Sequence, residues 1–320
     1  MVEGVHGEGR AAGDPLRRLP AAGLPARLLV RRRVGSAYVD DLDWEAHRPA
    51  VFGAAYRLLG SVAEAEDVVQ DVWLRASAAD RSAVADPRAW LVTIAARLAY
   101  NVLKSARVRR ERYPGPWLPE PLPTGPDASE RVIVDDSIGT AMLLVMDELT
   151  PPERVAFVLH DVFEVPFAQV AEVLGNSAAA SRKLASRARK RVADARGEHP
   201  RSSRAEHERV LTAFRAATER GDLARLVELL HPDAVYVADG GGKVVASRRP
   251  VVGADRVARL LAHVTTHYRV ERIEPIEING EPALAAHRDG RIIWIDTLEI
   301  QNGRITKYHR VANPEKLTHL

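Results

Sequence analysis

One segment near the middle of the chain limits the possible folds more than any other. Residues 111–130, ERYPGPWLPEPLPTGPDASE, hold six prolines in 20 positions. Proline fixes φ and lacks an amide N–H, so neither a regular helix nor a central strand passes through such a density. We expect a semi-rigid, extended linker of about 3.1 Å per residue. The 320-residue chain is therefore divided, and its parts are analysed separately.

Composition narrows the class of protein. The chain is 46% hydrophobic, enough to build two or three cores, and it has no cysteine. Disulfides, thiolate metal sites and cysteine nucleophiles are excluded, which fits a cytoplasmic protein. The sequence has no run of 18 apolar residues, so it predicts no membrane-spanning helix. Residues 1–36 carry seven arginines against three acidic residues and predict a disordered basic extension, or alternatively an arm that touches nucleic acid. We expect no cofactor and no metal, since DDLDWEAH offers no defensible ligand geometry.

Helical patterns alternate with short breaks over residues 43–110. In SVAEAEDVVQDVWLRAS the apolar residues follow helical spacing, and Ser61 with Glu64 forms a capping box. A second helix is predicted to follow Asp86 as N-cap, with Pro87 in its first turn. This part should form an all-α bundle.

Residues 131–195 are helical again and end in a helix-turn-helix pattern. PFAQVAEVLGNSAAASRKLASRARKRV predicts a helix, a tight turn at Gly175 and a second helix, with Val170, Leu174, Leu184 and Ala188 as packing residues. The second helix holds six cations and no acid over residues 177–191, which favours DNA over a merely solvated basic helix. Ser177 would cap it. We expect base-reading positions at Ser181, Arg182, Ser186 and Arg187, and phosphate contacts from Lys183, Arg189, Lys190 and Arg191.

Two further helix faces are candidates for binding. An ordinary solvated face explains the first almost as well and is the default interpretation of the second. One is basic and could contact DNA, with Tyr100 able to stack on open strands; it consists of Arg97, Tyr100, Asn101, Lys104 and Arg107. The other suits a basic partner surface; it consists of Glu64, Asp67, Gln70, Asp71 and Leu74.

After a polar linker at residues 196–204 the pattern changes. Two helical segments within 205–231 precede the β-type runs AVYVA, KVVAS, HYRVERIEPIEI, ALAAHR, RIIWIDTLEI and RITKYHRVA. Residues 205–320 are therefore predicted to form an α+β domain with a curved antiparallel sheet. Its DGGGK stretch lacks the spacing and the Ser or Thr of a phosphate-binding loop, so we expect a tight turn.

The order of these motifs resembles that of bacterial extracytoplasmic-function (ECF) sigma factors. The resemblance rests on HRPAVFGAAYRLLGSVAEAEDVVQDVWLRA, DPRAWLVTIAARLAYNVLKSARVRRERY and the helix-turn-helix. It implies that residues 37–110 are sigma region 2 and residues 131–195 are region 4. By this resemblance the face around Asp67 binds the β′ clamp of core RNA polymerase, and region 4 meets the β flap. The Arg97 face would then meet the −10 element of promoter DNA, and the second helix of the helix-turn-helix the −35 element.

Three short motifs resemble the subgroup, called SigJ-like, that carries a fused C-terminal SnoaL-like domain. They are WLPEPL, DGGGK and NPEKL, the last of which usually has Asp where Glu315 stands. The resemblance implies that the fused domain regulates the sigma factor in cis, with the glycine turn facing the linker or the sigma domains. The implied contact residues are Trp117, Leu118, Pro119, Glu120, Asp239, Gly240, Gly241, Gly242, Lys243, Asn313, Pro314, Glu315, Lys316 and Leu317.

Two other functions stay open at this point. One is a helix-turn-helix regulator that senses a small ligand in its C-terminal cone. The other is a cone-fold isomerase or hydrolase with a DNA-binding appendage. An enzyme would need converging acid–base groups, for which the sequence offers Tyr236, Asp239, His267, His287 and Asp296. A sigma factor that is not itself an enzyme is the function we predict.

Overall fold

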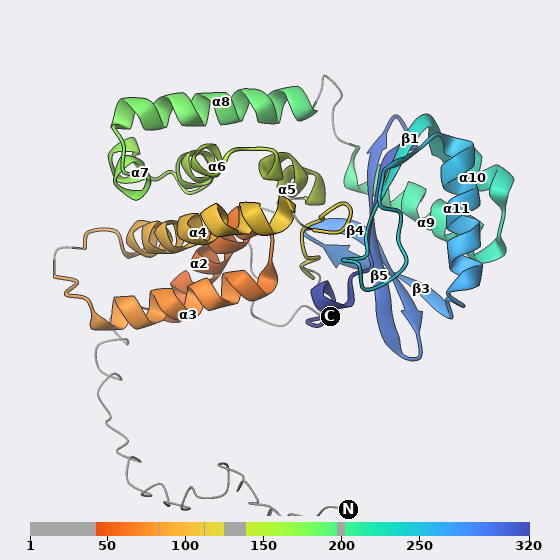
Figure 1. The fold of residues 1–320 in the computed structure, drawn as a ribbon, viewed down its shortest axis with the longest axis horizontal. Coiled ribbons are helices and arrows are strands. Elements are labelled where there is room, and N and C mark those ends of the chain that lie inside the picture. Colours follow the sequence, from red (N-terminus) through yellow and green to blue (C-terminus); the bar gives the residue numbers. More distant parts are fainter. Residues whose placement is uncertain (1–42, 83, 112, 125–138, 197–201) are drawn as a thin grey trace, which may run out of the picture.

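The computed structural model describes residues 43–82, 84–111, 113–124, 139–196 and 202–320. The predicted basic extension at residues 1–36 lies outside the described residues. Two helical domains lie on one side of the molecule and a sheet-containing domain on the other (Figure 1). The described part of the proline-rich linker and the C-terminus lie between them.

The first helical domain consists of α2 (Trp44–Leu59), α3 (Val62–Ala78) and α4 (Pro87–Glu111). Both predicted caps are present: the Ser61 hydroxyl accepts from the Glu64 amide, and Asp86 Oδ1 accepts from the Ala89 amide at 3.0 Å. Such caps satisfy amides that have no partner within the helix. Each helix buries an apolar stripe at helical spacing, which on α3 comprises Ala65, Val68, Val69, Val72 and Ala76.

The second helical domain consists of α5 (Thr140–Asp147), α6 (Pro151–Phe157), a π-helical turn (Val158–Val162), α7 (Phe167–Leu174) and α8 (Ala178–Arg196). A capping box between Thr150 and Glu153 starts α6. Gly175 ends α7 with φ of 66°, a left-handed conformation that glycine adopts without strain. The helix-turn-helix is therefore formed where it was predicted.

The two helical domains are packed against each other. One continuous core contains side chains of both, including Phe52 and Leu91 from the first domain and Met146 and Leu159 from the second. Arg154 of α6 is buried, and its Nη1 donates to the carbonyl oxygen of Leu58 in α2 at 2.9 Å. A buried guanidinium with such a partner is costly to release, so it fastens the two domains together.

The C-terminal domain combines helices with one six-stranded sheet. Its helices are α9 (Arg204–Arg220), α10 (Leu223–Leu229), α11 (Ala254–His267) and a 3-10 turn (Pro314–Lys316). Its strands are β1 (Leu230–Asp239), β2 (Val251–Val252), β3 (Arg272–Ile278), β4 (Glu281–Arg288), β5 (Arg291–Gln301) and β6 (Arg304–Val311). The strand order is β2-β1-β6-β5-β4-β3.

The predicted sheet needs three corrections. β1 and β6 pair in parallel while the other neighbours are antiparallel, because β1 and β6 are not joined by a hairpin and the chain reaches β6 only after β5. KVVAS is not a strand: residues 243–247 form the turn and loop that follow the glycines, whose positive φ turns the chain away from β1. Helix α11 was not predicted, although DRVARLLAHVTTH has helical spacing.

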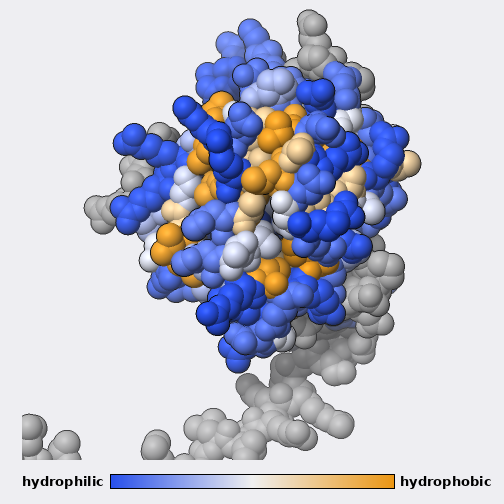
Figure 2. All heavy atoms as spheres, turned by 90° about the vertical axis from the view of Figure 1, so that its right-hand side faces the viewer, coloured by the Kyte–Doolittle hydropathy of each residue, from blue (hydrophilic) through white to orange (hydrophobic). Residues whose placement is uncertain are grey.

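The two faces of the sheet pack against different parts of the chain. One face packs on α9, α10 and α11 around Phe214, Tyr308 and Leu261. The opposite face packs Ile278 and Ile295 on Leu118 of the linker and on residues after β6. Figure 2 looks onto the side of the molecule that carries the C-terminal domain, where hydrophobic residues gather between hydrophilic ones. The opposite face of the sheet is the one that meets the rest of the molecule.

His309 on β6 is a buried titratable group with a pH effect on stability. Burial, and then the charge of Lys307, lowers its pKa to about 4, although Glu299 Oε1 lies 4.0 Å from its Nε2. The unfolded chain binds the proton near pH 6.5 and the folded one only near pH 4, so stability is lost as pH falls through this window. We expect the free energy of unfolding to drop by about 2 kcal/mol from pH 7 to pH 5 through this residue. Urea unfolding of the unaltered chain and of His309→Gln at both pH values measures it, and equal drops in the two would contradict it.

Candidate functional sites

Helix α8 presents a continuous basic face to solvent. Ala179, Lys183, Ser186 and Lys190 recur at steps of four, three and four residues and are all exposed. In Figure 1 this helix lies along the upper edge of the helical part of the molecule. An exposed helix with cations and a small polar side chain at such spacing has the shape and charge to enter a major groove.

The structure places the other predicted residues of α8 differently from one another. Ser177 caps the helix, its Oγ accepting from the Ala180 amide at 3.2 Å. Ser181 is wholly buried and donates to Asn176 Oδ1 at 2.7 Å, which corrects its prediction as an exposed base-reading residue. It faces inward because it lies four positions before the buried Ala185 on the same helix face. Arg182 lies over the ring of Phe167.

Three arginines of α8 pair with acidic residues of their own domain. Arg187 Nε lies 3.6 Å and Arg191 Nη1 2.9 Å from the Glu153 carboxylate. Arg189 Nε lies 3.1 Å from Asp161 Oδ1. These pairs fix the arginines at the two edges of the basic face. The guanidinium groups of Arg187, Arg189 and Arg191 nevertheless stay half exposed and can still contact DNA.

The other two predicted faces are also open to solvent. On α4, Arg97, Asn101 and Lys104 are exposed, and Lys104 Nζ lies 4.0 Å from the centre of the Tyr100 ring. The side chain of Arg107 lies outside the described residues. The α3 face comprises exposed Asp67, Gln70, Asp71 and Leu74 and half-buried Glu64. Leu74 is 60% exposed and Trp73 beside it 37%, an apolar pair within an acidic surface.

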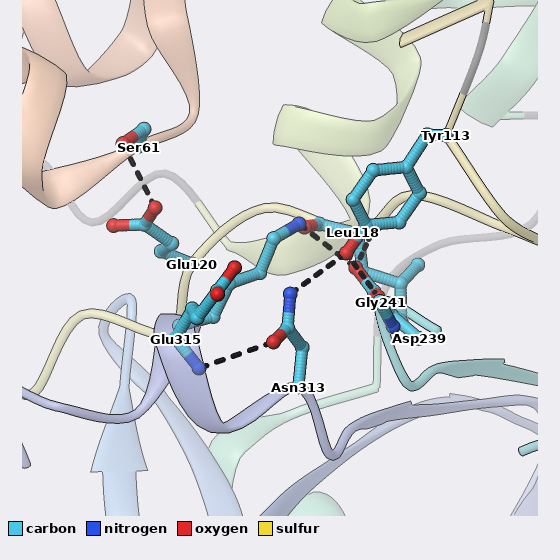
Figure 3. A network of polar contacts seen from close by, with 9 residues as sticks. Ser61, Tyr113, Leu118, Glu120, Asp239, Gly241, Asn313 and Glu315 are labelled. Atoms are coloured by element: carbon cyan, nitrogen blue, oxygen red, sulfur yellow. Dashed lines mark hydrogen bonds and ion pairs between the residues drawn. The ribbon is translucent and has the colours of Figure 1, made fainter. Parts of the chain in front are cut away.

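The three short motifs meet at a single buried carboxylate (Figure 3). Asp239 of DGGGK is fully buried, and its Oδ2 accepts from the Leu118 amide at 2.9 Å and from Lys316 Nζ at 2.8 Å. Its Oδ1 accepts from the Tyr113 hydroxyl at 2.7 Å and from the Gly241 amide at 3.0 Å. We call Asp239, Lys316, Tyr113 and Leu118 the linker hub. Two of its members belong to the linker and two to the C-terminal domain.

The ring of Trp117 and the side-chain amide of Asn313 also contact the linker hub. Lys316 Nζ lies 4.1 Å from the centre of the Trp117 ring and 5.2 Å from that of Tyr113. Burial, and then the hydrogen bond to Asp239, raises the pKa of Tyr113, so its hydroxyl stays protonated and donates. Asn313 Nδ2 donates to the same hydroxyl oxygen at 2.9 Å. The linker is thus held by a buried, charged network rather than by apolar contact alone.

The remaining motif residues surround the hub. A Cβ at Gly241, where φ is 58°, would overlap the Asn313 side chain, and one at Gly242 would lie 2.8 Å from Pro114 Cγ. The glycines therefore let the turn approach the linker and the C-terminal tail. Lys243 pairs with Glu315 at 2.8 Å on the surface. The other predicted contact residues lie in the same neighbourhood, with Gly240 beside Ala246, Pro119 beside Gly60, Pro314 opening the 3-10 turn, and Leu317 packed on the sheet face that meets the linker.

Glu120 of WLPEPL ties the linker to the first helical domain. One carboxylate oxygen accepts from the Ser61 hydroxyl at 2.8 Å and the other from the Val62 amide at 2.6 Å. The carboxylate therefore sits at the N-terminus of α3, where the helix dipole and free amides favour an anion. Trp117 packs on Gly60 in the same α2–α3 turn. The linker thus contacts the start of the helix that carries the acidic face.

Sequence reasoning missed a junction of three domains at Asn279. This buried residue turns the chain between β3 and β4 with φ of 54°. Its Oδ1 accepts from the Tyr56 hydroxyl of α2 at 2.9 Å, and its Nδ2 donates to Thr140 Oγ1 of α5 at 3.2 Å. Its amide donates to the Leu122 carbonyl of the linker at 2.8 Å. The Asn-Gly pair at 279–280 was a visible hairpin signal, but nothing in it revealed these partners.

The end of the linker adds to the edge of the sheet. Pro123 forms an antiparallel bridge with Ile278, and the Thr124 amide donates to the Glu277 carbonyl at 3.1 Å. Strand β3 is an edge strand, with unpaired backbone groups that can accept such an addition. Apart from this bridge, residues 113–124 form neither helix nor strand. The segment lies on the C-terminal domain and does not hold the two helical domains apart, because they share one core.

The side chains considered for acid–base catalysis do not converge. Asp239 is held on one face of the sheet by the linker hub. Asp296 lies on the other face in a bidentate pair with Arg310, at 2.7 and 2.8 Å. His287 pairs with Glu274, and His267 is exposed at the end of α11. Only Tyr236 shares a neighbourhood with Asp296, through the guanidinium of Arg310.

Neither a membrane-spanning helix nor a cluster of metal ligands occurs among the described residues. None of their helices combines the length and the apolar character needed to cross a membrane. None of their clusters of His, Asp and Glu brings three such side chains close enough to hold a metal ion.

Comparison with known proteins identifies the two helical domains. The chain matches the Sigma-70 region 2 family over residues 44–109 and the Sigma-70 region 4 family over residues 140–192. The basic helix-turn-helix and the preceding bundle thus define a sigma factor of two regions. ECF RNA polymerase sigma factor SigJ of Mycobacterium tuberculosis is 40% identical over 290 residues, covering 86% of this chain and 92% of that protein. The chain belongs to the ECF RNA polymerase sigma factors and has the SigJ-like arrangement.

Two further comparisons extend the likeness to the C-terminal domain. Probable ECF RNA polymerase sigma factor SigI of Mycobacterium tuberculosis is 35% identical over 281 residues, covering 86% of this chain and 93% of that protein. A crystal structure of SigJ from the same organism superposes with a TM-score of 0.70 at 39% identity, covering 88% of this chain and 98% of that one. As a sigma factor, the protein directs core RNA polymerase to promoters and takes part in transcription initiation.

Proposed function

We propose that three faces carry the sigma function and that the C-terminal domain controls it in cis. The α3 face would dock on the β′ clamp of core polymerase, with region 4 against the β flap. The α4 face would meet the −10 element and the α8 face the −35 element. Nucleotide addition would remain the work of the polymerase. The packing of both sigma regions into one core is the observation that carries the regulatory part.

The α3 face supports docking to a protein. Exposed Leu74 and Trp73 are apolar, and the acidic residues around them repel DNA but attract a basic protein surface. An apolar centre with a charged rim is the usual anatomy of a protein interface.

In this conformation the two sigma regions lie too close together to bind both promoter elements at once. The −10 and −35 elements are about 25 base pairs apart, roughly 85 Å along B-DNA at 3.4 Å per step. Regions 2 and 4 share one core here, and Arg154 of region 4 bonds to the Leu58 carbonyl of region 2. Both elements can be bound together only after the regions separate. The linker hub and Asn279 oppose that separation, because they hold the linker and both regions on the C-terminal domain.

The Asn279 junction gives the test of regulation. Asn279→Ala removes one side-chain hydrogen bond to each sigma region. We expect run-off transcription with core polymerase to rise tenfold or more, since each lost buried hydrogen bond weakens the contact by about 1 kcal/mol and about 1.4 kcal/mol is a factor of ten. The template is the DNA upstream of the gene for this protein.

The chain offers a matched control in Asn302. It occupies the same kind of Asn-Gly turn with φ of 51°, but it is exposed at the β5–β6 turn. Asn302→Ala carries the same backbone strain and should leave transcript yield unchanged. Equal yields from the two variants would contradict the regulatory proposal. A parallel reaction without the protein tests the sigma function itself, because it should give no transcript.

A second prediction distinguishes a residue of α8 that contacts bases from one that contacts phosphates. Arg187→Ala should cost about 1–3 kcal/mol at the cognate −35 sequence and much less at altered ones, as expected of a base contact. Lys190→Ala should weaken binding to all sequences alike and lower the salt slope by about one. Binding of the reconstituted holoenzyme to promoter fragments with altered −35 elements measures both. Identical profiles of the two variants would contradict this division of roles.

A further inference from the structure

A buried carboxylate lies behind the basic face of α8. Glu153 is the third residue of α6, and its side chain is only 3% exposed. Its Oε2 accepts from the Thr150 amide at 3.1 Å and from the Thr150 hydroxyl at 2.7 Å, which closes the capping box. The same oxygen lies 2.9 Å from Arg191 Nη1, and Oε1 lies 3.6 Å from Arg187 Nε. One side chain therefore joins the start of α6 to two arginines of α8.

The cap by itself does not explain the charge of Glu153. A capping box takes glutamine as well as glutamate at this position, because it needs only a side-chain oxygen. The side chain is nevertheless held as a carboxylate. Burial opposes its charge, but hydrogen bonds from Thr150, and then the positive charges of Arg191 and Arg187, outweigh burial and lower the pKa of Glu153. Its negative charge is therefore available to the two arginines.

Arg187 and Arg191 are held on one side and open to solvent on the other. They lie four positions apart on α8, where two cations repel each other, and Glu153 offsets that repulsion because it contacts both. Their side chains are 65% and 51% exposed, so N–H groups that do not face Glu153 stay accessible. A guanidinium is a rigid plane of N–H donors. Fixing one edge of that plane on a carboxylate therefore also fixes the direction of its outer edge.

A held arginine discriminates among DNA sequences better than a free one. A free guanidinium follows any phosphate, and such contacts give affinity that does not depend on sequence. A held guanidinium bonds only to an acceptor at its own position, such as the O6 and N7 atoms of guanine in the major groove. The buried carboxylate also cancels part of the positive charge that would attract DNA of every sequence to α8.

We propose that Glu153 is a specificity-determining residue of region 4, whose carboxylate holds Arg187 and Arg191 and lowers the affinity of α8 for DNA of arbitrary sequence. Glu153 is buried and acts through the two arginines, so it is a positioning residue and not itself a DNA contact. The inference rests on the role in −35 recognition proposed above for α8.

Glu153→Gln tests the proposal, because it keeps an oxygen for the cap and removes the charge. The reconstituted holoenzyme is titrated with a promoter fragment that has the cognate −35 element and with one in which only that element is scrambled. The variant should bind the scrambled fragment about fivefold more tightly, and the cognate fragment within about twofold of the unaltered chain. The salt dependence on the scrambled fragment should steepen by about one to two, since each new phosphate contact contributes about 0.9 to the slope.

Three further variants control for charge and for folding. Glu172→Gln removes the same charge from an exposed residue of α7 and should change both affinities less than about twofold. Glu153→Asp keeps the charge but withdraws the carboxylate from the arginines, because it is one methylene shorter, and it should give a smaller gain on scrambled DNA. Arg191→Met added to Glu153→Gln should reverse part of the gain. Thermal unfolding checks each fold, and a variant that only damaged the fold would bind both fragments more weakly.

Two outcomes overturn the proposal: no tighter binding of the scrambled fragment by Glu153→Gln and Glu153→Asp, or an equal gain from Glu172→Gln. The unaltered holoenzyme distinguishes this failure from failure of the proposed function. If it binds the cognate and the scrambled fragments equally, α8 does not read the −35 element and both proposals fail. If it prefers the cognate fragment and both Glu153 variants keep that preference, only the role of Glu153 is wrong.

Discussion

An Asp239→Ala variant is expected to release the linker and raise promoter-directed transcription more than any other single change. Asp239 has four donors, and its loss leaves Lys316 buried without its carboxylate. Breaking a buried pair by removing one partner costs about 3–5 kcal/mol. Part of that cost falls on the contact between linker and C-terminal domain, because Tyr113 and Leu118 lose their acceptor together. The sigma regions should then separate more readily.

Two measurements test this variant. Run-off transcription should rise more than tenfold, and small-angle scattering of the free protein should show a larger radius of gyration. Asp233→Ala is the matched control, since Asp233 lies exposed on the same strand, and it should change neither quantity. Asp239→Ala combined with Lys316→Met should recover part of the stability, because no uncompensated charge remains. An unchanged radius and transcript yield in Asp239→Ala would contradict the assigned role of the linker hub.

The second large effect is expected inside the C-terminal domain, at Asp296. Burial disfavours a charged guanidinium, but Asp296 outweighs it and raises the pKa of Arg310 well above its usual value. Asp296→Ala leaves that charge buried among Trp294, Tyr308 and Tyr236. We expect the free energy of unfolding of this domain to fall by about 3–5 kcal/mol.

Urea unfolding measures this loss, and the same two strands supply its control. Glu299 and Lys307 pair across β5 and β6 at 3.2 Å, but near the surface. Glu299→Ala should cost less than about 1 kcal/mol, because solvent screens such a pair. The double variant Asp296→Leu with Arg310→Met should lie close to the unaltered protein. Equal losses from Asp296→Ala and Glu299→Ala would show that burial does not decide the strength of these pairs.

The regulatory and structural predictions differ in the property that each variant changes. Asp239 and Asn279 contact the linker or the sigma regions, so their variants act on the balance between packed and separated regions. Among the described residues, Asp296 bonds to Arg310 inside its own domain, so its variant acts first on folding. Comparing transcript yield with unfolding therefore distinguishes release of the sigma regions from loss of the C-terminal fold.

Local chemistry in the sequence determined much of the fold and the class of protein. Ser61 and Asp86 marked helix starts, Gly175 marked the turn of the helix-turn-helix, and the cations of α8 indicated DNA. These signals are readable because caps, turns and helix periodicity depend on residues within a few positions of one another. The motifs WLPEPL, DGGGK and NPEKL were recognised in the same way, as short strings.

Only the tertiary structure decided how distant segments meet. Asp239, Lys316 and Leu118 are separated by up to 198 positions, yet share one buried network. Asn279 touches Tyr56 across 223 positions. The parallel pairing of β1 with β6 is likewise a contact between segments far apart in the sequence. Long-range partners are chosen by packing of the whole chain, in which a buried polar group takes whichever partner the fold brings near, and no local pattern records that choice.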